Sequence, residues 1–172
     1  MYFEELTLHN FGIFRGRHTL DLSVEPDKPI LLIGALNGGG KTTILDALQL
    51  ALHGKFARCS NRGTMGYEAF LKKAMNRYSD PTEGSAVELE FTRYVANRPE
   101  TIRVIRTWRQ TGSTVKEQLE VTRDGKHDPV YSENWYEHVD EFIPTRLAEL
   151  FFFDGEKIEY FADPVNASEL IR

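Results

Sequence analysis

The sequence is poor in cysteine and in long apolar runs, and it has no excess of basic residues. Its single cysteine, Cys59, excludes a disulfide-stapled scaffold and fits a reducing compartment. No segment approaches the roughly 20 consecutive apolar residues that a membrane-spanning helix needs. The N-terminus carries two acidic residues where a signal peptide begins with basic ones. We therefore expect a cytoplasmic protein with no membrane partner.

Charge and composition restrict the function classes further. The chain has 21 basic and 26 acidic residues, a formal net charge of −5, which argues against a protein coated by nucleic acid but leaves room for a local basic patch. The five histidines show no metal-ligand spacing. A hydrophobic fraction of 41% and a length of 172 residues are ordinary for one globular domain. Internal repeats and low-complexity segments are absent.

Periodicity in the first third of the chain predicts a hairpin, a strand and a helix. Residues 3–8 and 17–22 alternate apolar and polar side chains, which predicts two antiparallel strands. Residues 30–33 are apolar at every position and are predicted to form a buried central strand. Residues 44–52 predict an amphipathic helix that closes at Gly54, a residue typical of helix C-termini.

The remaining chain predicts a meander followed by helices and a second apolar strand. The meander has three strands, over residues 85–95, 101–111 and 115–123. Helices are expected over residues 67–75, 131–142 (with Ser132 as N-cap) and 156–161, a fully apolar strand over 150–153, and a last helix from residue 164.

A glycine-rich loop joins the predicted strand at residues 30–33 to the helix that follows, which is the context that a P-loop requires. Glycines let successive backbone N–H groups point at an anion, and the helix start adds the positive end of its dipole. The expected cofactors are ATP and Mg²⁺, with Lys41 on the β- and γ-phosphates and the Thr42 hydroxyl on the metal. The predicted binding residues are Asn37, Gly38, Gly39, Gly40, Lys41, Thr42 and Thr43.

One residue departs from the usual G-x-x-x-x-G-K-T pattern of this loop. Ala35 stands where the first glycine would be, and Gly34 lies one residue earlier. Alanine disfavours a positive φ but tolerates ordinary backbone angles. The binding face of the loop, residues 37–40, is therefore expected to be intact.

The order of these motifs resembles the N-terminal head segment of SMC-like ATPases. F-E-E-L-T-L-H-N-F over residues 3–11 comes before L-N-G-G-G-K-T-T-I-L-D-A-L-Q-L-A-L-H-G over residues 36–54, and the resemblance covers essentially the whole chain. It implies an α/β fold: the N-terminal lobe of an ABC/SMC-type P-loop NTPase head, with an antiparallel β-meander. The implied domains are this lobe over residues 1–163 and the start of a helix leading to a coiled coil over residues 164–172.

The same resemblance implies that this lobe does not work alone. Heads of this family combine an N-terminal and a C-terminal lobe, and no L-S-G-G-like signature stretch occurs in this sequence. Hydrolysis would therefore need the protein's own C-terminal lobe and a second head, which makes the ATP-bound form a homodimer. DNA would be reached through the assembled complex.

Residues 149–158, E-L-F-F-F-D-G-E-K-I, are similar to DndD, the ATPase of the bacterial DNA phosphorothioation (Dnd) system. This resemblance implies a role in DNA sulfur modification, with other Dnd proteins as partners. Three alternatives stay open. They are an SMC-like ATPase lobe of a DNA repair or recombination complex, a self-contained small P-loop kinase, and a module that senses nucleotide without hydrolysis.

Asp154 follows an apolar run and has three interpretations. In a Walker B motif it would hold Mg²⁺, with Glu156 placed to position water. The family resemblance aligns it instead with the Q-loop, where a glutamine is usual; a carboxylate also suits Mg²⁺. A plain Asp-Gly turn is the third interpretation. On the first two, Asp154 is a metal ligand and, with Lys41, a catalytic residue.

Several arginines are further candidates. The family often has a basic residue near the nucleotide after the first turn, which points to Arg15 and Arg17, although a solvated strand start is an equal alternative. Arg62, in the loop after the helix, is a weaker candidate for contacting the base or ribose. Five arginines of the meander are either solvated or part of a DNA-facing patch: Arg93, Arg98, Arg103, Arg106 and Arg109.

Overall fold

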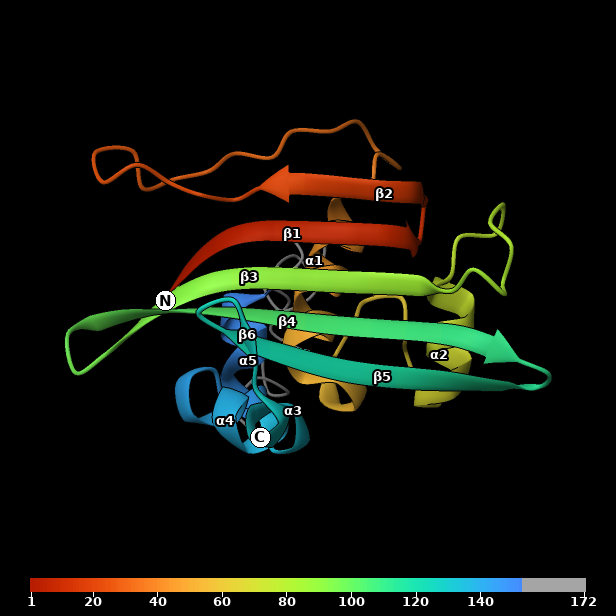
Figure 1. The fold of residues 1–172 in the computed structure, drawn as a ribbon. Coiled ribbons are helices and arrows are strands. Elements are labelled where there is room, and N and C mark those ends of the chain that lie inside the picture. Colours follow the sequence, from red (N-terminus) through yellow and green to blue (C-terminus); the bar gives the residue numbers. More distant parts are fainter. Residues whose placement is uncertain (153–172) are drawn as a thin grey trace, which may run out of the picture.

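The structure, a computed structural model, describes residues 1–152 and contains one six-stranded antiparallel sheet with helices on one of its faces (Figure 1). The strand order is β2-β1-β3-β4-β5-β6. The predicted N-terminal hairpin and meander are confirmed, and they form a single sheet because β1 pairs with β3. The strands are β1 (Tyr2–Phe11), β2 (Phe14–Asp21), β3 (Ser85–Val95), β4 (Arg98–Thr111), β5 (Thr114–Arg123) and β6 (Lys126–His127).

The helices predicted within the described residues are present, but one of them is divided into two. The helix predicted over residues 131–142 is two helices that meet at Asn134, and its first cap is Asp128, whose carboxylate accepts the Tyr131 N–H at 2.9 Å. Ser132 does not cap the helix but accepts the Val121 N–H at 2.9 Å. The helical elements are α1 (Lys41–His53), η1 (Gly54–Phe56), α2 (Tyr67–Ala74), α3 (Pro129–Glu133), α4 (Trp135–Phe142), η2 (Thr145–Leu147) and α5 (Ala148–Phe151).

The strand predicted over residues 30–33 is wrong. This segment has no strand partner among the described residues, and it lies outside the six-stranded sheet. Ile30 is 84% exposed, Leu32 is 89% exposed and Leu36 is 88% exposed. An isolated extended segment lacks the ladder hydrogen bonds and the packing that define a strand. The burial predicted for residues 30–33 is therefore wrong as well.

The strand predicted over residues 150–153 is also wrong for residues 150–152, because the short helix α5 runs through Phe151, and residue 153 lies outside the described residues. Phe151 is exposed, whereas Phe152 is buried and stacks on Phe3 with ring centroids 6.3 Å apart. No strand of the described chain pairs with this segment. Asp154, the predicted helical turn over residues 156–161 and the helix from residue 164 lie outside the described residues.

The core lies between the sheet and the helices. Alternate strand residues point inward, and each large apolar side chain buried there contributes about 1.5–3 kcal/mol. Leu50 and Leu52 come from α1 and Trp135 from α4. Within residues 1–152, no helix is long and apolar enough to cross a membrane. The buried strand residues include Leu6, Leu8, Val87, Leu89, Phe91, Ile102, Val104, Trp108 and Val121.

The C-terminal end of α1 is held by two buried donors. Arg106 donates from Nε to the Ala51 carbonyl at 2.9 Å, and Trp135 donates from Nε1 to the Leu52 carbonyl at 2.7 Å. Both carbonyls belong to the last turn of α1, where no N–H group of the helix donates to them. Burial, and then the nearby Arg106 charge, lower the pKa of His53 to about 4, so this imidazole is neutral at physiological pH.

Most of the meander arginines are paired with carboxylates rather than available to DNA. Arg103 contacts Glu5, Glu88 and Glu90 at 2.8–3.0 Å. Arg106 is buried and pairs with Glu117 at 2.9 Å. Arg93 pairs with Glu100 at 2.7 Å, while Arg98 and Arg109 are exposed. The pairs neutralise three of the five predicted cations, which removes most of the charge from a DNA-facing patch.

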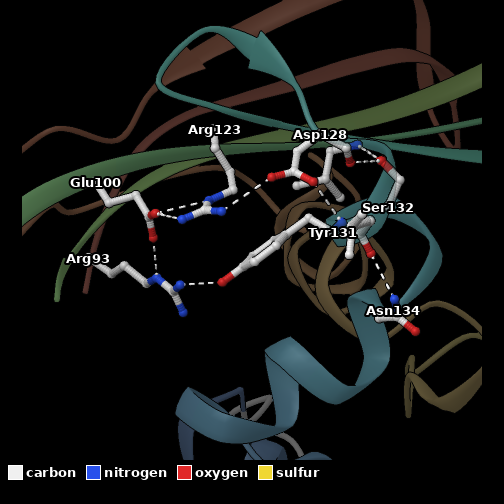
Figure 2. Close-up of polar contacts among 9 residues, drawn as sticks. Arg93, Glu100, Arg123, Asp128, Tyr131, Ser132 and Asn134 are labelled. Carbon is white, nitrogen blue, oxygen red and sulfur yellow. Dashed lines mark hydrogen bonds and ion pairs between the residues drawn. The ribbon is translucent and has the colours of Figure 1, made fainter.

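A second group of ion pairs fastens α3 to the sheet (Figure 2). Glu100 accepts from both Arg93 and Arg123, and Arg123 also contacts Asp128 at 3.2 Å. The guanidinium of Arg123 lies over the Tyr131 ring, 4.4 Å from its centroid, and Arg93 donates to the Tyr131 hydroxyl. Partial burial raises the pKa of Glu100, but the hydrogen bonds from Arg123 and Arg93 outweigh it and hold the pKa below its ordinary value.

Candidate phosphate-binding site

The loop before α1 has a backbone that only glycine fits at three successive positions. Gly38 and Gly40 have φ of +79° and +94°, in the left-handed region. Gly39 is required for space instead, because a Cβ there would lie 2.8 Å from the Ala35 Cβ and 2.9 Å from the Leu36 carbonyl oxygen. The Gly39 N–H donates to that same oxygen at 2.9 Å, which closes the loop into a turn.

Ala35 is accommodated without backbone strain. It is not among the non-glycine residues with positive φ, so the expectation that alanine keeps ordinary angles there is confirmed. Its methyl group faces Gly39, the residue that lacks a side chain. The loop therefore tolerates one Cβ at this contact but not two.

The N-terminus of α1 is open to an anion. Gly40 is the N-cap and supplies no side-chain cap, and the first turn contains no acidic residue. The first intrahelical bond runs from the Ile44 N–H to the Gly40 carbonyl at 2.9 Å. Backbone N–H groups before it have no acceptor within the helix, and the dipole makes this end positive. A phosphate group would accept hydrogen bonds from backbone N–H groups at this end and would bring the negative charge that the dipole favours.

Lys41 adds a full positive charge to this loop. Its side chain is exposed and folds back, so that Nζ donates to the carbonyls of Ala35 at 2.8 Å and Leu36 at 3.2 Å. The ammonium thus lies over the loop and stays accessible to solvent. An anion at the helix N-terminus would meet this charge directly.

The turn between β1 and β2 packs against the same loop. Gly12 approaches Thr43 so closely that a Cβ on Gly12 would lie 2.5 Å from Thr43 Cγ2. Ile13 and Phe14 contact Gly40, where a Cβ would lie 2.9 Å from each side chain. Arg15 is exposed near the start of β2, directly after the two residues that contact Gly40.

The remaining predicted residues are placed as follows. Asn37 is exposed, and Thr42 and Thr43 are partly buried at the start of α1. Asp154 lies outside the described residues, so its three interpretations remain predictions. Arg62 holds its own loop, because it donates to the carbonyls of Lys55, Ala57 and Met65.

Two buried polar residues around the site escaped sequence reasoning. Asp46 on α1 is buried and accepts the N–H groups of Ser60 at 2.7 Å and Asn61 at 3.3 Å, which ties the following loop to the helix. Asn10 is buried at the end of β1 and joins several loops. The available signal was a polar residue within an otherwise apolar pattern, which rarely occurs without hydrogen-bond partners.

Comparison with known proteins supports an ATPase assignment for this geometry. A family model described as an AAA domain matches residues 5–170. The SbcC component of the nuclease SbcCD from Treponema pallidum is 38% identical over 88 residues, which are 51% of this chain and 7% of that protein. The corresponding component from Vibrio cholerae is 43% identical over 87 residues, 51% of this chain and 8% of that protein. The matched part thus spans less than a tenth of either relative.

Proposed function

Because the chain belongs to the AAA domain family and has the α/β fold of an ABC/SMC-type P-loop NTPase N-terminal lobe, we propose that it is the ATP-binding lobe of an SMC-like ATPase in a DNA repair or recombination complex. The observation that carries the proposal is the glycine loop over residues 37–40, which ends at the uncapped N-terminus of α1. The two relatives, each named as part of a nuclease, support the DNA repair context.

The residues of the loop fit a magnesium nucleotide. The backbone of residues 38–43 and the Lys41 ammonium would hold the phosphates, and the Thr42 hydroxyl would be a ligand of Mg²⁺. Arg15, near the start of the adjacent strand β2, would add a second cation in the same region. The bound nucleotide supplies the phosphoanhydride bond; the chain itself orients the phosphates and balances their charge.

Turnover would need a second lobe. The apolar residues 30–36 are exposed directly before the loop, and a folded protein in water rarely leaves such a run uncovered. A strand from the C-terminal lobe would pair with it and complete the head. We extend the proposal to a dimer of such heads, with residues 1–163 as the N-terminal lobe and residues 164–172 as the start of a coiled-coil helix.

The partners follow from the relatives' names and remain part of the proposal. Both relatives are named as one component of a nuclease, so we propose a nuclease component and DNA as partners in a cytoplasmic complex. Neither is named for DNA sulfur modification. That role, with other Dnd proteins as partners, has only the resemblance of residues 149–158 behind it and is the weaker candidate.

Nucleotide binding by the chain tests the proposal. A fluorescent ATP analogue is titrated into wild type, Lys41→Ala and Lys72→Ala, with and without Mg²⁺. Loss of charge-assisted contacts at Lys41 should weaken affinity at least about tenfold. Lys72, an exposed lysine on α2, is the matched control and should bind as wild type does. Equal affinity for all three proteins would contradict the proposed site.

A further inference from the structure

The geometry points to Asn10 as a positioning residue for the phosphate loop. Its buried side chain fixes the turn between β1 and β2, and that turn packs on Gly40 and Thr43. The hydrogen bonds of the Asn10 side chain go to residues outside the loop. The inference rests on the proposed nucleotide-binding function and extends it to a residue that acts through another segment.

The side chain of Asn10 is saturated with hydrogen bonds. It is 2% exposed, and its Oδ1 accepts from the Gly16 N–H at 2.8 Å and from the Ser79 hydroxyl at 2.7 Å. Its Nδ2 lies 3.3 Å from the Gly84 carbonyl and 3.4 Å from a Glu83 carboxylate oxygen. A buried amide with these partners is costly to displace, because any movement leaves polar groups unsatisfied.

The backbone of Asn10 extends the same connection. Its carbonyl accepts from the Asn76 N–H at 2.7 Å and from the Ser85 hydroxyl at 2.7 Å. Asn10 therefore joins the end of β1, the start of β2 and the segment between α2 and β3. The segment between α2 and β3 is about 60 or more residues away from the other two in sequence, and Asn10 contributes to holding all three together.

The turn is fixed at a second point on the same side. The Gly12 N–H donates to the Ala74 carbonyl at 2.7 Å, and Asn76 Nδ2 donates to the Gly12 carbonyl at 2.9 Å. On its other side the turn meets Thr43 and Gly40 with no room for a Cβ. The turn is thus a spacer between the α2–β3 segment and the phosphate loop, and a shift at one side must reach the other.

The phosphate loop depends on this support because its conformation is unusual. Gly40 holds a φ of +94° as the N-cap, and its orientation decides where the first N–H groups of α1 point. If the turn moves, the loop populates other conformations. The apparent affinity for nucleotide then falls in proportion to the fraction of molecules whose loop can still bind. Asn10 would then control nucleotide affinity without touching nucleotide.

The backbone at position 10 allows the role of the Asn10 side chain to be tested without a change of backbone conformation. Asn10 has a φ of +48°, which glycine adopts without strain, so Asn10→Gly removes the side-chain hydrogen bonds and keeps the backbone geometry. Asn97 provides the matched control. It also has a positive φ, +63°, but it lies exposed in the turn between β3 and β4, away from the phosphate loop.

The experiment measures two quantities on the full chain. Affinity for the fluorescent ATP analogue with Mg²⁺ is measured well below the unfolding temperature, and amide exchange of residues 36–43 is followed without nucleotide. Asn10→Gly should bind about tenfold more weakly, as expected when the competent fraction falls to a tenth, and its loop should exchange faster. Asn97→Gly should match wild type in both. A purely structural role would lower the unfolding temperature and leave both quantities unchanged.

The outcomes separate this inference from the function on which it rests. Folded Asn10→Gly with wild-type affinity and wild-type loop exchange overturns the inference and leaves the proposed function standing. Wild type that is folded but does not bind the analogue contradicts the proposed function, while the loop exchange still tests positioning. If Asn10→Gly does not fold, Ser79→Ala removes one hydrogen bond to Oδ1. It should show a smaller loss in the same direction, and no change in Ser79→Ala overturns the inference.

Discussion

At the scale of single residues, the departure from the usual loop pattern is explained by a neighbour four positions away. The Ala35 methyl group fits because Gly39 has no side chain. A Cβ on Gly39 would lie 2.8 Å from the Ala35 Cβ and 2.9 Å from the Leu36 carbonyl oxygen. A first glycine is therefore not a geometric requirement in this loop. The requirement falls on Gly39 through space and on Gly38 and Gly40 through backbone angle.

This contact predicts unequal effects of two small substitutions. Gly39→Ala places a Cβ within 3 Å of two atoms and should weaken nucleotide affinity by about tenfold, within the range of overpacking costs. Ala35→Gly removes a methyl group from the same contact and should leave affinity within about twofold. Titration with the ATP analogue measures both.

Gly66→Ala is the control for adding a methyl group. Gly66 has a φ of −60°, and the space that a Cβ would occupy there is open, so alanine fits. Wild-type affinity in Gly39→Ala would mean that the loop rearranges freely, against the close contacts described above. Reduced affinity in Ala35→Gly would show that Ala35 contributes in its own right.

At the scale of elements, α1 is supported at both ends by different chemistry. Its C-terminal carbonyls accept from Arg106 and Trp135, and its N-terminus packs against the β1–β2 turn. The sheet thus holds the helix that presents the phosphate loop. The α3 helix is held in turn by the ion pairs around Glu100 (Figure 2).

The Glu100 pairs predict a measurable loss of stability. Glu100→Gln keeps the shape of the side chain but leaves Arg93 and Arg123 close together without a carboxylate between them. The free energy of unfolding should fall by about 2 kcal/mol, the range of hydrogen bonds to charged groups. Urea denaturation measures it, with the exposed Glu133→Gln as control. A difference below about 0.5 kcal/mol, typical of exposed pairs, would show that the pairs are only solvated surface contacts.

The same carboxyl gives this prediction a pH dependence. The folded pKa of Glu100 lies below the ordinary value of 4.5, so the folded state binds fewer protons than the unfolded state in that range. Its contribution is complete above pH 4.5 and is lost as pH falls through the lowered folded pKa. The difference between wild type and Glu100→Gln should therefore shrink in acid.

At the scale of the whole molecule, the exposed apolar residues 30–36 distinguish a lobe from a complete head. Ile30, Leu32 and Leu36 are almost fully exposed, next to a loop suited to phosphate. Burying such a run on another strand would give both backbone hydrogen bonds and apolar contact. On the proposed function, the molecule would present a site for assembly next to a site for nucleotide.

This arrangement predicts that turnover appears only on assembly. The chain alone should hydrolyse ATP weakly or not at all, and the C-terminal part of the parent protein should raise the rate and protect residues 30–33 from amide exchange. Leu32→Lys places a charge in the proposed contact and should abolish both effects while leaving nucleotide binding intact. Lys28→Glu, at an exposed position before the run, is the control. Robust phosphate transfer by the chain alone would favour a self-contained kinase instead.

The meander arginines show where sequence reasoning stops. The spacing of Arg93, Arg103 and Arg106 is compatible with a basic surface, but the carboxylates that neutralise them come from other strands. Pairing between strands depends on register, which alternation alone does not specify. Charge on a sheet can therefore be assigned only once its neighbours are known.

The sequence by itself determined the elements whose signals are local. The hairpin, the meander, α1 and the glycine loop follow from period, turn residues and the Lys41-Thr42 pair, because each depends on neighbours within a few positions. Only the tertiary structure decided the rest. It left residues 30–33 outside the sheet, made residues 148–151 helical and joined Asn10 to the segment between α2 and β3. These features depend on partners that are distant in sequence or absent from residues 1–152. The low cysteine content of the chain and its net charge of −5 carry no information about them.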